Sequence, residues 1–475
     1  MLRRSLNEHG SELNVIMKLL KQFLFPALVC ACPLHAASPA TTAPAKPNVI
    51  FILSDDIGRG DISALGGKQG ETPNLDRLAS EGTVFQRFYV ASPICSASRT
   101  AFVTGMFPAR WKINSFLHER SGNAKCEQAN WLDPKAPIMA RAFKEAGYAT
   151  AHFGKWHLGG GRDVQDAPLP SAYGFDESHV NCEGMGPRFE DFGTGGKPAL
   201  NSEDGKQYFR HDMTRYWVDR SLEFIKRQAG KPFYLELWPQ DVHSPHNPSP
   251  EALARTATPG LPNQQHSFRG VLNEYDRQIG RFMDALRQLG LEKNTIVVFT
   301  GDNGPEPSFE HARTLGQRGM KWSLYEGGLH EPFFVRWPGH VPAGKTNEVT
   351  LVSSVDCFPT LCALAGVNPP ANAPFDGVDQ SAAWLGATPQ RKTPLFWEYG
   401  RKPKGYRYPR PAEDKSPNLC VREGDWKLLV NADGTKAELY NAATDPKETT
   451  NAAAEHPEIA SRLTKLALEW RKSLP

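Results

Sequence analysis

The sequence has no large surplus of charge of either sign and no long apolar run. Its 55 basic and 52 acidic side chains give a formal net charge of +3 over 475 residues. A protein that binds nucleic acid usually has a marked basic surplus, so this class is disfavoured and no nucleic-acid partner is expected. The apolar run at residues 23–32 is too short to span a bilayer. We therefore expect a globular protein with one large domain, or with a large and a small one.

The N-terminus has the residue order of a secretory signal. Lys18 and Lys21 precede the apolar run, and small residues follow it through Ala36. We expect residues 1–36 to be a cleaved signal peptide and residues 37–47 a flexible leader. The protein is then exported, either periplasmic or secreted. The alternative is a lipoprotein anchored at Cys32, the one case in which a membrane is expected as a partner.

Cysteine is scarce, with eight in the chain and no Cys-x-x-Cys pair, so a zinc site is not expected. Cys357 and Cys362 lie in an apolar stretch and are expected to be buried thiols. An exported protein could pair some of the others. Six cysteines remain after removal of the signal peptide: Cys95, Cys126, Cys182, Cys357, Cys362 and Cys420.

Apolar runs alternate with helical periodicity over residues 48–390. The runs at residues 49–53, 233–238 and 295–300 are typical of strands buried on both faces of a parallel sheet. Residues 271–289 have helical spacing. This alternation predicts an α/β fold with a large, mainly parallel sheet flanked by helices.

The sequence also predicts where one helix begins and how the C-terminal part is built. Thr72 and Pro73 are the predicted cap and first residue of a helix. After about residue 390, short apolar runs are separated by turns such as Asp433-Gly434, and a last helix is predicted over residues 457–473. We therefore expect a small C-terminal antiparallel sheet with a helix, over residues 391–475.

Polar side chains follow each of the three predicted strands. Asp55 and Asp56 follow the first run, His243 follows the second, and Asp302 and Asn303 follow the third. Ligands of open α/β sheets bind at the carboxyl ends of the strands, so these side chains should meet. Either acidic pair alone is better explained by turn capping. Two such pairs favour a calcium or magnesium site, because a divalent cation relieves the repulsion between crowded carboxylates.

The segment CSASR at residues 95–99 precedes a predicted helix. A helix N-terminus favours negative charge, and Arg99 adds a fixed cation. The plain alternatives for Cys95 are a packed small side chain or a thiolate nucleophile. A second motif, GKWHLG at residues 154–159, places Lys155 and His157 two residues apart, where an extended segment would direct both to one face.

These motifs together resemble those of the type I sulfatases, in the alkaline-phosphatase-like superfamily. CSASR is similar to the sulfatase motif Cys-x-(Pro/Ala)-x-Arg, whose cysteine is oxidised to formylglycine. GKWHLG, ETPNLDR, YEGG and WPG are similar to further strings of that family, as are VREGDWK and ELYN near the C-terminus. The resemblance covers nearly the whole mature chain, with residues 48–390 as the catalytic domain. It is strongest to the arylsulfatase A and N-acetylgalactosamine-6-sulfatase group.

The resemblance implies hydrolysis of sulfate monoesters, on a sulfated carbohydrate, through a calcium-bound formylglycine hydrate derived from Cys95. One calcium ion per chain would be held by Asp55, Asp56, Asp302, Asn303 and the modified Cys95. Arg99 would fix the hydrate, Lys155 and His157 would contact the hydrate and the sulfate, and His243 and Lys321 would contact the sulfate and protonate the departing alkoxide. The partners would be the sulfated glycan and a maturation enzyme that generates formylglycine.

The sequence departs from the family pattern in several places. Ala97 replaces the commoner proline, which leaves the maturation system open, and His330 stands where many relatives have arginine. The loops at residues 112–132 and 161–206 match poorly, so substrate choice is expected there. No role is assigned to His246 or His330. The alternatives are a phosphodiesterase or phosphonate monoester hydrolase of the same superfamily, and a catalytically silent glycan-binding homologue.

Overall fold

The computed structural model describes residues 46–181, 208–228, 230–371, 373–402 and 405–475. The expected signal peptide, most of the leader and Cys182 lie outside the described residues, as does much of the loop at residues 161–206. None of the described helices is both long enough and apolar enough to cross a membrane.

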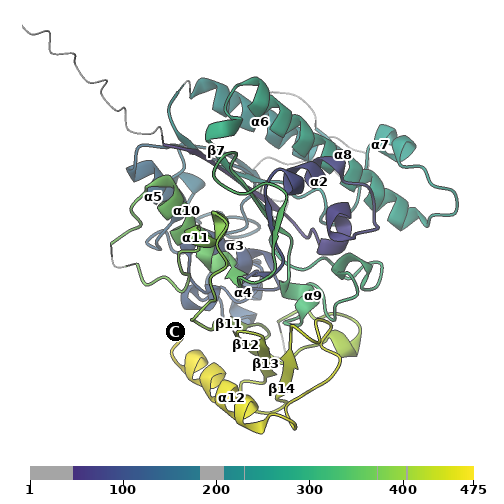
Figure 1. Ribbon diagram of the computed structural model, residues 1–475, viewed down its shortest axis with the longest axis vertical. Helices are drawn as coiled ribbons and strands as arrows, with labels where there is room; N and C mark the ends of the chain where they lie inside the picture. The colour runs from purple at the N-terminus through teal and green to yellow at the C-terminus, as the bar shows by residue number, and fades with distance from the viewer. Residues whose placement is uncertain (1–45, 182–207, 229, 372, 403–404) are drawn as a thin grey trace, which may run out of the picture. The chain divides into compact units, whose positions relative to one another are not determined.

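An eight-stranded sheet forms the centre of the fold (Figure 1). Its strands lie in the order β5-β4-β6-β1-β7-β8-β2-β9. The strands from β5 to β7 are parallel to one another, whereas β8 is antiparallel to both of its neighbours. The predicted large, mainly parallel sheet is therefore confirmed. The bounds are β1 Asn48–Ser54, β2 Thr83–Phe85, β4 Ala149–Lys155, β5 Glu177–Asn181, β6 Phe233–Trp238, β7 Thr295–Gly301, β8 Phe333–Arg336 and β9 Lys345–Asn347.

Side chains of β1 alternate between two separate hydrophobic cores, because successive residues of a strand point to opposite faces. Val49, Phe51 and Leu53 belong to one core, and Ile50 and Ile52 belong to the other. All five are fully buried. Burial on both faces explains why this strand is apolar throughout its length.

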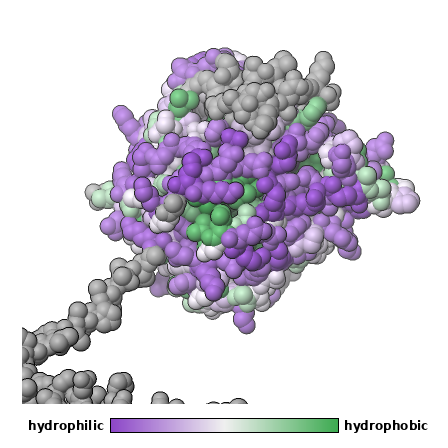
Figure 2. Space-filling model, turned by 90° about the horizontal axis from the view of Figure 1, so that it is seen from above, coloured by the Kyte–Doolittle hydropathy of each residue, from purple (hydrophilic) through white to green (hydrophobic). Residues whose placement is uncertain are grey.

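Helices cover both faces of the sheet (Figure 1). The core that contains Ile50 is closed by α2 (Pro73–Ser80), α6 (Met213–Arg227) and α8 (Asn263–Gln288). The opposite core is closed by α3 (Cys95–Thr104), α5 (Met139–Glu145), α10 (Cys357–Ala365) and α11 (Ser381–Trp384). Hydrophilic side chains dominate the face seen in Figure 2, around an apolar area near its centre. The shorter elements are β3 (Phe88–Tyr89), β10 (Val352–Ser353), α4 (Arg120–Lys125), α7 (Pro250–Arg255) and α9 (Glu326–Leu329).

Helix α2 begins at Pro73 as predicted, but the Thr72 side chain does not cap it. The Thr72 hydroxyl instead accepts the N–H of Ser63 at 2.9 Å. The carboxylate of Asp276, in α8, accepts the N–H of Leu75 at 2.8 Å. An acceptor on a neighbouring helix thus satisfies a first-turn N–H group that a local cap would otherwise satisfy.

A four-stranded antiparallel sheet and a long helix form the C-terminal part, at the lower end of Figure 1. Strands β11 to β14 pair in chain order, and the helix α12 lies against them. The predicted antiparallel sheet with a terminal helix is confirmed. The bounds are β11 Leu395–Glu398, β12 Leu419–Glu423, β13 Trp426–Val430, β14 Glu438–Asn441 and α12 Pro457–Lys472.

A buried cluster of charges joins the small sheet to α9. Lys427 of β13 contacts the carboxylates of Glu326 and Glu448, each at 2.9 Å. The hydroxyl of Tyr89 donates to Glu326 at 2.7 Å. All four side chains are nearly inaccessible to solvent. Such a cluster tolerates the loss of a partner poorly, because the buried carboxylates lose their nearest cation and only Arg422, 3.7 Å from Glu326, is left to compensate them.

We expect Lys427→Ala to lower the free energy of unfolding by about 3–5 kcal/mol, because Glu326 and Glu448 would lose their shared cation. The exposed pair Arg462–Glu423 offers a control. There, Arg462→Ala should cost at most about 1 kcal/mol. Calorimetric unfolding of the wild type and both variants measures the difference. Equal stability of the two variants would show that the buried cluster does not anchor the small sheet.

Candidate active site

Four neighbouring strands bring the candidate site together at their carboxyl ends. Asp55 follows β1, Asp302 follows β7, Lys155 is the last residue of β4, and His243 lies in the loop after β6. These strands are adjacent in the order β4-β6-β1-β7, so their ends meet at one edge of the sheet. The sequence separates these segments widely, and the topology alone brings them together.

The side chains of Asp55, Asp302 and Cys95 converge. One potential ligand atom of each lies within 4.8 Å of the others, and the same is true of Asp56, Cys95 and His243. Cys95 is the first residue of α3, so it stands at a helix N-terminus as the sequence predicts. Residue 95 is thus common to both groups and lies at the centre of the site.

Buried cations compensate two of these carboxylates. Arg99 Nη2 lies 3.0 Å from Asp55 and 2.7 Å from Asp302, and Lys155 Nζ lies 2.7 Å from Asp55. Burial alone would raise the pKa of the Asp55 carboxyl. The permanent positive charges of Lys155, Arg99 and Lys321 outweigh burial and hold that pKa well below its usual value. Asp55 is therefore ionised in the folded protein.

Asp56 is held in a strained backbone conformation. Its φ of 59° lies in the left-handed region, which is rare for a residue other than glycine and persists only where neighbours fix it. Lys321 Nζ and Asn303 Nδ2 each contact its carboxylate at 2.6 Å. The guanidinium of Arg313 donates to its carbonyl oxygen at 2.7 Å. These contacts aim the Asp56 carboxylate at the centre of the site.

The side chains of this cluster fit a hard divalent cation. Three carboxylates and an amide oxygen are the donors that calcium and magnesium take. The Asn303 Oδ1 atom is buried with no hydrogen-bond partner among the described residues, an arrangement that is costly unless a ligand satisfies it. Burial, together with the charge of Asp55, raises the pKa of Asp302 to about 7, as expected where carboxylates are crowded.

His243 lies at the rim of the cluster. Its Nδ1 is 2.7 Å from the carbonyl oxygen of Ser244, which can only accept, so the ring hydrogen is assigned to Nδ1. Its Nε2 faces Asp56 at 3.6 Å and Glu306 at 3.7 Å. Burial lowers the pKa of His243 to about 4, so the imidazole is neutral at neutral pH. Nε2 is therefore the ring atom that can exchange a proton with a ligand.

His157 departs from the predicted extended segment. Strand β4 ends at Lys155, and the φ of 50° at His157 turns the chain. The His157 Nε2 lies 3.3 Å from the carbonyl oxygen of Leu117. The N–H of Leu117 in turn donates to Ser96 Oγ at 2.9 Å, beside Cys95. His157 is thus linked to the start of α3 through the loop at residues 112–132.

Cys95 is a buried thiol. Burial raises its pKa well above the usual value, although Lys155 and Lys321 oppose the shift. A thiolate nucleophile, one alternative from the sequence, requires a lowered pKa instead. The other described cysteines are free, buried thiols, as expected for two of them: Cys126, Cys357, Cys362 and Cys420.

Two side chains near the site were missed by the sequence reasoning. Glu306 follows Asn303 closely in the chain, and that proximity was the only available signal. Arg313 pairs with Asp61 at 2.8 Å in addition to binding the Asp56 carbonyl, and no motif marks it. The two histidines without an assigned role contact main-chain oxygens: His246 Nε2 lies 3.1 Å from Val242 O and His330 Nε2 lies 2.5 Å from Gln86 O.

Comparison with known proteins identifies the family. The Sulfatase family model matches residues 47–367, and a model of the N-sulphoglucosamine sulphohydrolase C-terminal region matches residues 319–473. The chain is 31% identical to human N-acetylgalactosamine-6-sulfatase, covering 92% of this chain and 87% of the relative. It is 30% identical to an N-acetylgalactosamine-6-O-sulfatase of Bacteroides thetaiotaomicron, covering 89% and 92%.

A solved structure agrees with these matches. Ps i-CgsB, in complex with k-i-k-neocarrahexaose, has a TM-score of 0.75 and 27% identity, covering 90% of this chain and 92% of that chain. The same family is indicated by the acidic residues after β1 and β7, by the cysteine at the start of α3 and by the matches along the chain. The chain belongs to the type I sulfatase family and is a sulfuric ester hydrolase on the alkaline-phosphatase-like fold.

Proposed function

We propose that the enzyme removes sulfate from a sulfated carbohydrate outside the cytoplasm, after oxidation of Cys95 to formylglycine. The observation that carries this proposal is the convergence of Asp55, Asp302 and Cys95 within 4.8 Å. The matched human and bacterial relatives are sulfatases of N-acetylgalactosamine, which supports a sugar sulfate as substrate. Export would follow from the signal peptide at residues 1–36, and residues 48–390 would form the catalytic domain beside a small subdomain at 391–475.

One calcium ion would complete the site. Its ligands would be Asp55, Asp56, Asp302, Asn303 and the modified residue 95. The bound ion would draw charge from the sulfuryl oxygens, and formylglycine would supply the attacking oxygen. The three aspartates are already balanced by Arg99, Lys155 and Lys321. Addition of a divalent ion therefore leaves the cluster positive, which attracts an anionic sulfate ester.

The chain's own cations would bind the sulfate. Lys155 and Lys321 are both buried, and the charge of each acts on residue 95. Fixed cations at this position stabilise the charge that develops on the sulfuryl oxygens, and they need no rearrangement during the reaction. Arg99 also donates to the Lys155 carbonyl at 3.0 Å, which ties the end of β4 to α3. Arg99 would thereby hold residue 95 in place.

His243 would protonate the departing oxygen from Nε2 when the ring carries hydrogens on both nitrogens, and it would return to the neutral Nδ1–H form afterwards. Its Nδ1 hydrogen is bound to the Ser244 carbonyl, so Nε2 is the atom that faces the substrate. Glu306, 3.7 Å from Nε2, would stabilise the protonated ring that this transfer needs. Lys321 would assist, since its Nζ and the Nε2 of His243 both approach Oδ2 of Asp56, at 2.6 and 3.6 Å. His157 would contact the sulfate and residue 95.

Lys321→Ala should lower kcat for a sulfate ester by about 100- to 1,000-fold, the usual cost of one electrostatic donor. The fold should persist, which circular dichroism checks. Lys293, an exposed lysine at the far end of β7, provides a control, and Lys293→Ala should leave kcat unchanged. Near-normal turnover by the Lys321→Ala variant would remove this residue from the proposed chemistry.

Mass spectrometry of the peptide that contains residue 95 should detect an aldehyde in place of the thiol in active enzyme. Cys95→Ala should abolish turnover, whereas Cys362→Ala, at another buried cysteine, should not. Sulfate esters and phosphonate esters assayed side by side separate the proposed activity from that of a phosphonate monoester hydrolase. An unmodified thiol in fully active enzyme would refute the formylglycine mechanism.

Chelation should abolish activity, and added calcium should restore it. Burial raises the pKa of Asp56 to about 6 and that of Asp302 to about 7. Calcium needs both carboxylates ionised, so protons compete with the ion below these values. The apparent calcium affinity should therefore rise as the pH passes from about 5 to about 8 and then level off, and calcium titrations at fixed pH measure this. An affinity independent of pH would contradict the assigned ligands.

A further inference from the structure

A cavity of about 850 Å³ opens beside His243. Its walls come from the loop after β6, the start of α8, the loop after β7 and residues 410–411 of the C-terminal part. Cavities that bind small molecules in proteins usually fall between about 300 and 1,000 Å³, so this one is large enough for a ligand of several rings. None of the residues assigned to the metal lines it.

The cavity adjoins the groups proposed to act on the departing oxygen. Ser244 and Glu306 belong to its wall, and both lie next to His243. The Ser244 carbonyl contacts Nδ1 of His243, and the Glu306 carboxylate faces Nε2. Met320 and Trp322, which also line it, flank Lys321 in the sequence. The cavity therefore adjoins the position at which His243 would protonate the departing oxygen.

The wall has a fixed rather than a loose shape. Phe309, Glu310 and Trp322 have φ values of 58°, 53° and 75°, all in the left-handed region that side chains other than glycine rarely adopt. Such conformations persist only where the surroundings hold them, and they gather at functional sites. The ring of Phe309 packs on Phe268 of α8, with ring centroids 5.4 Å apart. The cavity is therefore built by packing between separate segments.

Negatively and positively charged side chains lie at different places in the cavity wall. Glu306 lies next to His243, so a second anion close to the sulfate ester would be repelled. Arg410 is exposed at the wall and has no ion pair or hydrogen bond to another described residue. A guanidinium can pair in two-pronged fashion with either a carboxylate or a sulfate. Glu310, also exposed in the lining, adds a second negative charge, so Arg410 is the only cationic side chain among the described lining residues and the place where they favour an anionic group.

We propose that this cavity binds the carbohydrate that remains on the leaving oxygen, and that Arg410 pairs with a carboxylate or a second sulfate on a neighbouring sugar ring. The ring of Trp322 offers an apolar face to a sugar, and Gln264, Ser267 and Ser308 offer hydrogen-bonding partners to its hydroxyl groups. The inference rests on the proposed sulfatase activity and narrows its substrate to an acidic oligosaccharide. Arg410 is a specificity-determining residue and takes no part in bond cleavage.

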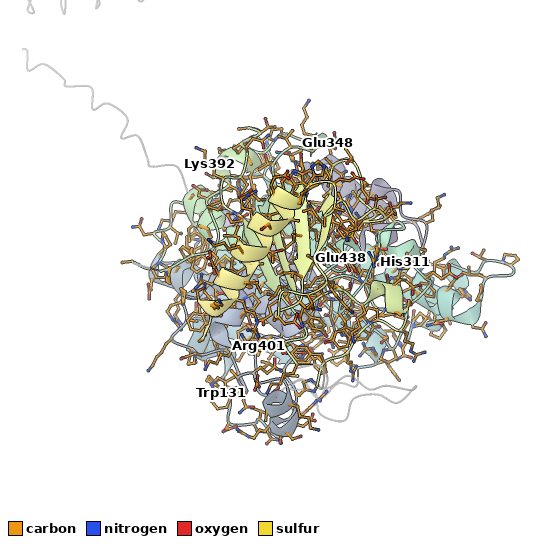
Figure 3. The ribbon with its side chains drawn as sticks, turned by 90° about the horizontal axis from the view of Figure 1, so that it is seen from below. Trp131, His311, Glu348, Lys392, Arg401 and Glu438 are labelled. Carbon is orange, nitrogen blue, oxygen red and sulfur yellow. The ribbon has the colours of Figure 1, made fainter. Side chains whose placement is uncertain are left out.

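Steady-state kinetics with four substrates test this proposal. They are 4-nitrophenyl sulfate, a monosulfated disaccharide whose second sugar is neutral, the same disaccharide with a uronic acid as second sugar, and the same disaccharide with a second sulfate there. The enzymes are the wild type, Arg410→Ala, Arg410→Glu and a control, Lys392→Ala. His311 directly follows Glu310, a residue of the cavity wall. Lys392 serves as the control because it lies on the opposite side of the view in Figure 3 from His311.

Arg410→Ala should raise the KM for at least one acidic disaccharide about tenfold, equivalent to about 1.4 kcal/mol, and Arg410→Glu should raise it further. The KM for the neutral disaccharide and for 4-nitrophenyl sulfate, and kcat throughout, should stay unchanged, and Lys392→Ala should match the wild type. The disaccharide whose KM responds identifies the anion as carboxylate or sulfate. The proposal is overturned if the KM values for acidic and neutral disaccharides change by the same factor, or if neither changes.

Failure of the proposed function is a different outcome. If the wild type cleaves none of the four sulfate esters, the proposed action on these sugar sulfates is refuted, and binding then tests the cavity. Calorimetric titration with the acidic disaccharide that lacks the ester sulfate should show binding to the wild type that Arg410→Ala weakens about tenfold. Absent binding, or equal binding by both proteins, would refute the cavity assignment.

Discussion

The mutual compensation of buried carboxylates and buried cations at the end of the central sheet is the constraint on which the rest of the protein depends. Asp55 and Asp302 share Arg99, and Lys155 adds a second cation to Asp55. Each of these groups would be unstable alone in so dry a place. Because they come from β1, β7, β4 and α3, the cluster forms only when those elements have assembled. The two hydrophobic cores exclude water from it, which strengthens each contact.

The segment between β11 and β12 of the C-terminal part supports this centre. The buried carboxylate of Asp414 accepts the N–H of Gly319 at 2.8 Å, and Ser416 Oγ accepts the N–H of Leu324 at 2.9 Å. Both contacts bracket Lys321, so the segment that delivers this cation is fixed by residues that follow the main domain. Arg410, at the wall of the cavity, comes from the same part of the chain. The C-terminal part therefore fixes the segment that carries Lys321 and forms part of the cavity wall.

How much could be predicted from the sequence depended on whether a signal was local. The strands β1, β6 and β7 were predictable because burial on both faces makes them apolar, and their polar followers were predictable because parallel strands end together. The cap of α2 was not predictable, because the acceptor of its Leu75 N–H group is Asp276, which lies on another helix. The turn at His157 was missed for a related reason: nothing in GKWHLG reveals a left-handed residue. Arg313 reaches Asp56 only through the tertiary fold.

The burial of Cys95 constrains when the protein can be made competent. The residue is only 2% exposed, at the first position of α3 and among polar groups that follow four strands. A second enzyme could not reach that sulfur in the finished molecule without unfolding the centre of the sheet. If the residue is oxidised as proposed, the encounter must take place while the nascent chain is still open. The biosynthetic order of events, rather than any property of the mature protein, would then decide what fraction of the molecules is active.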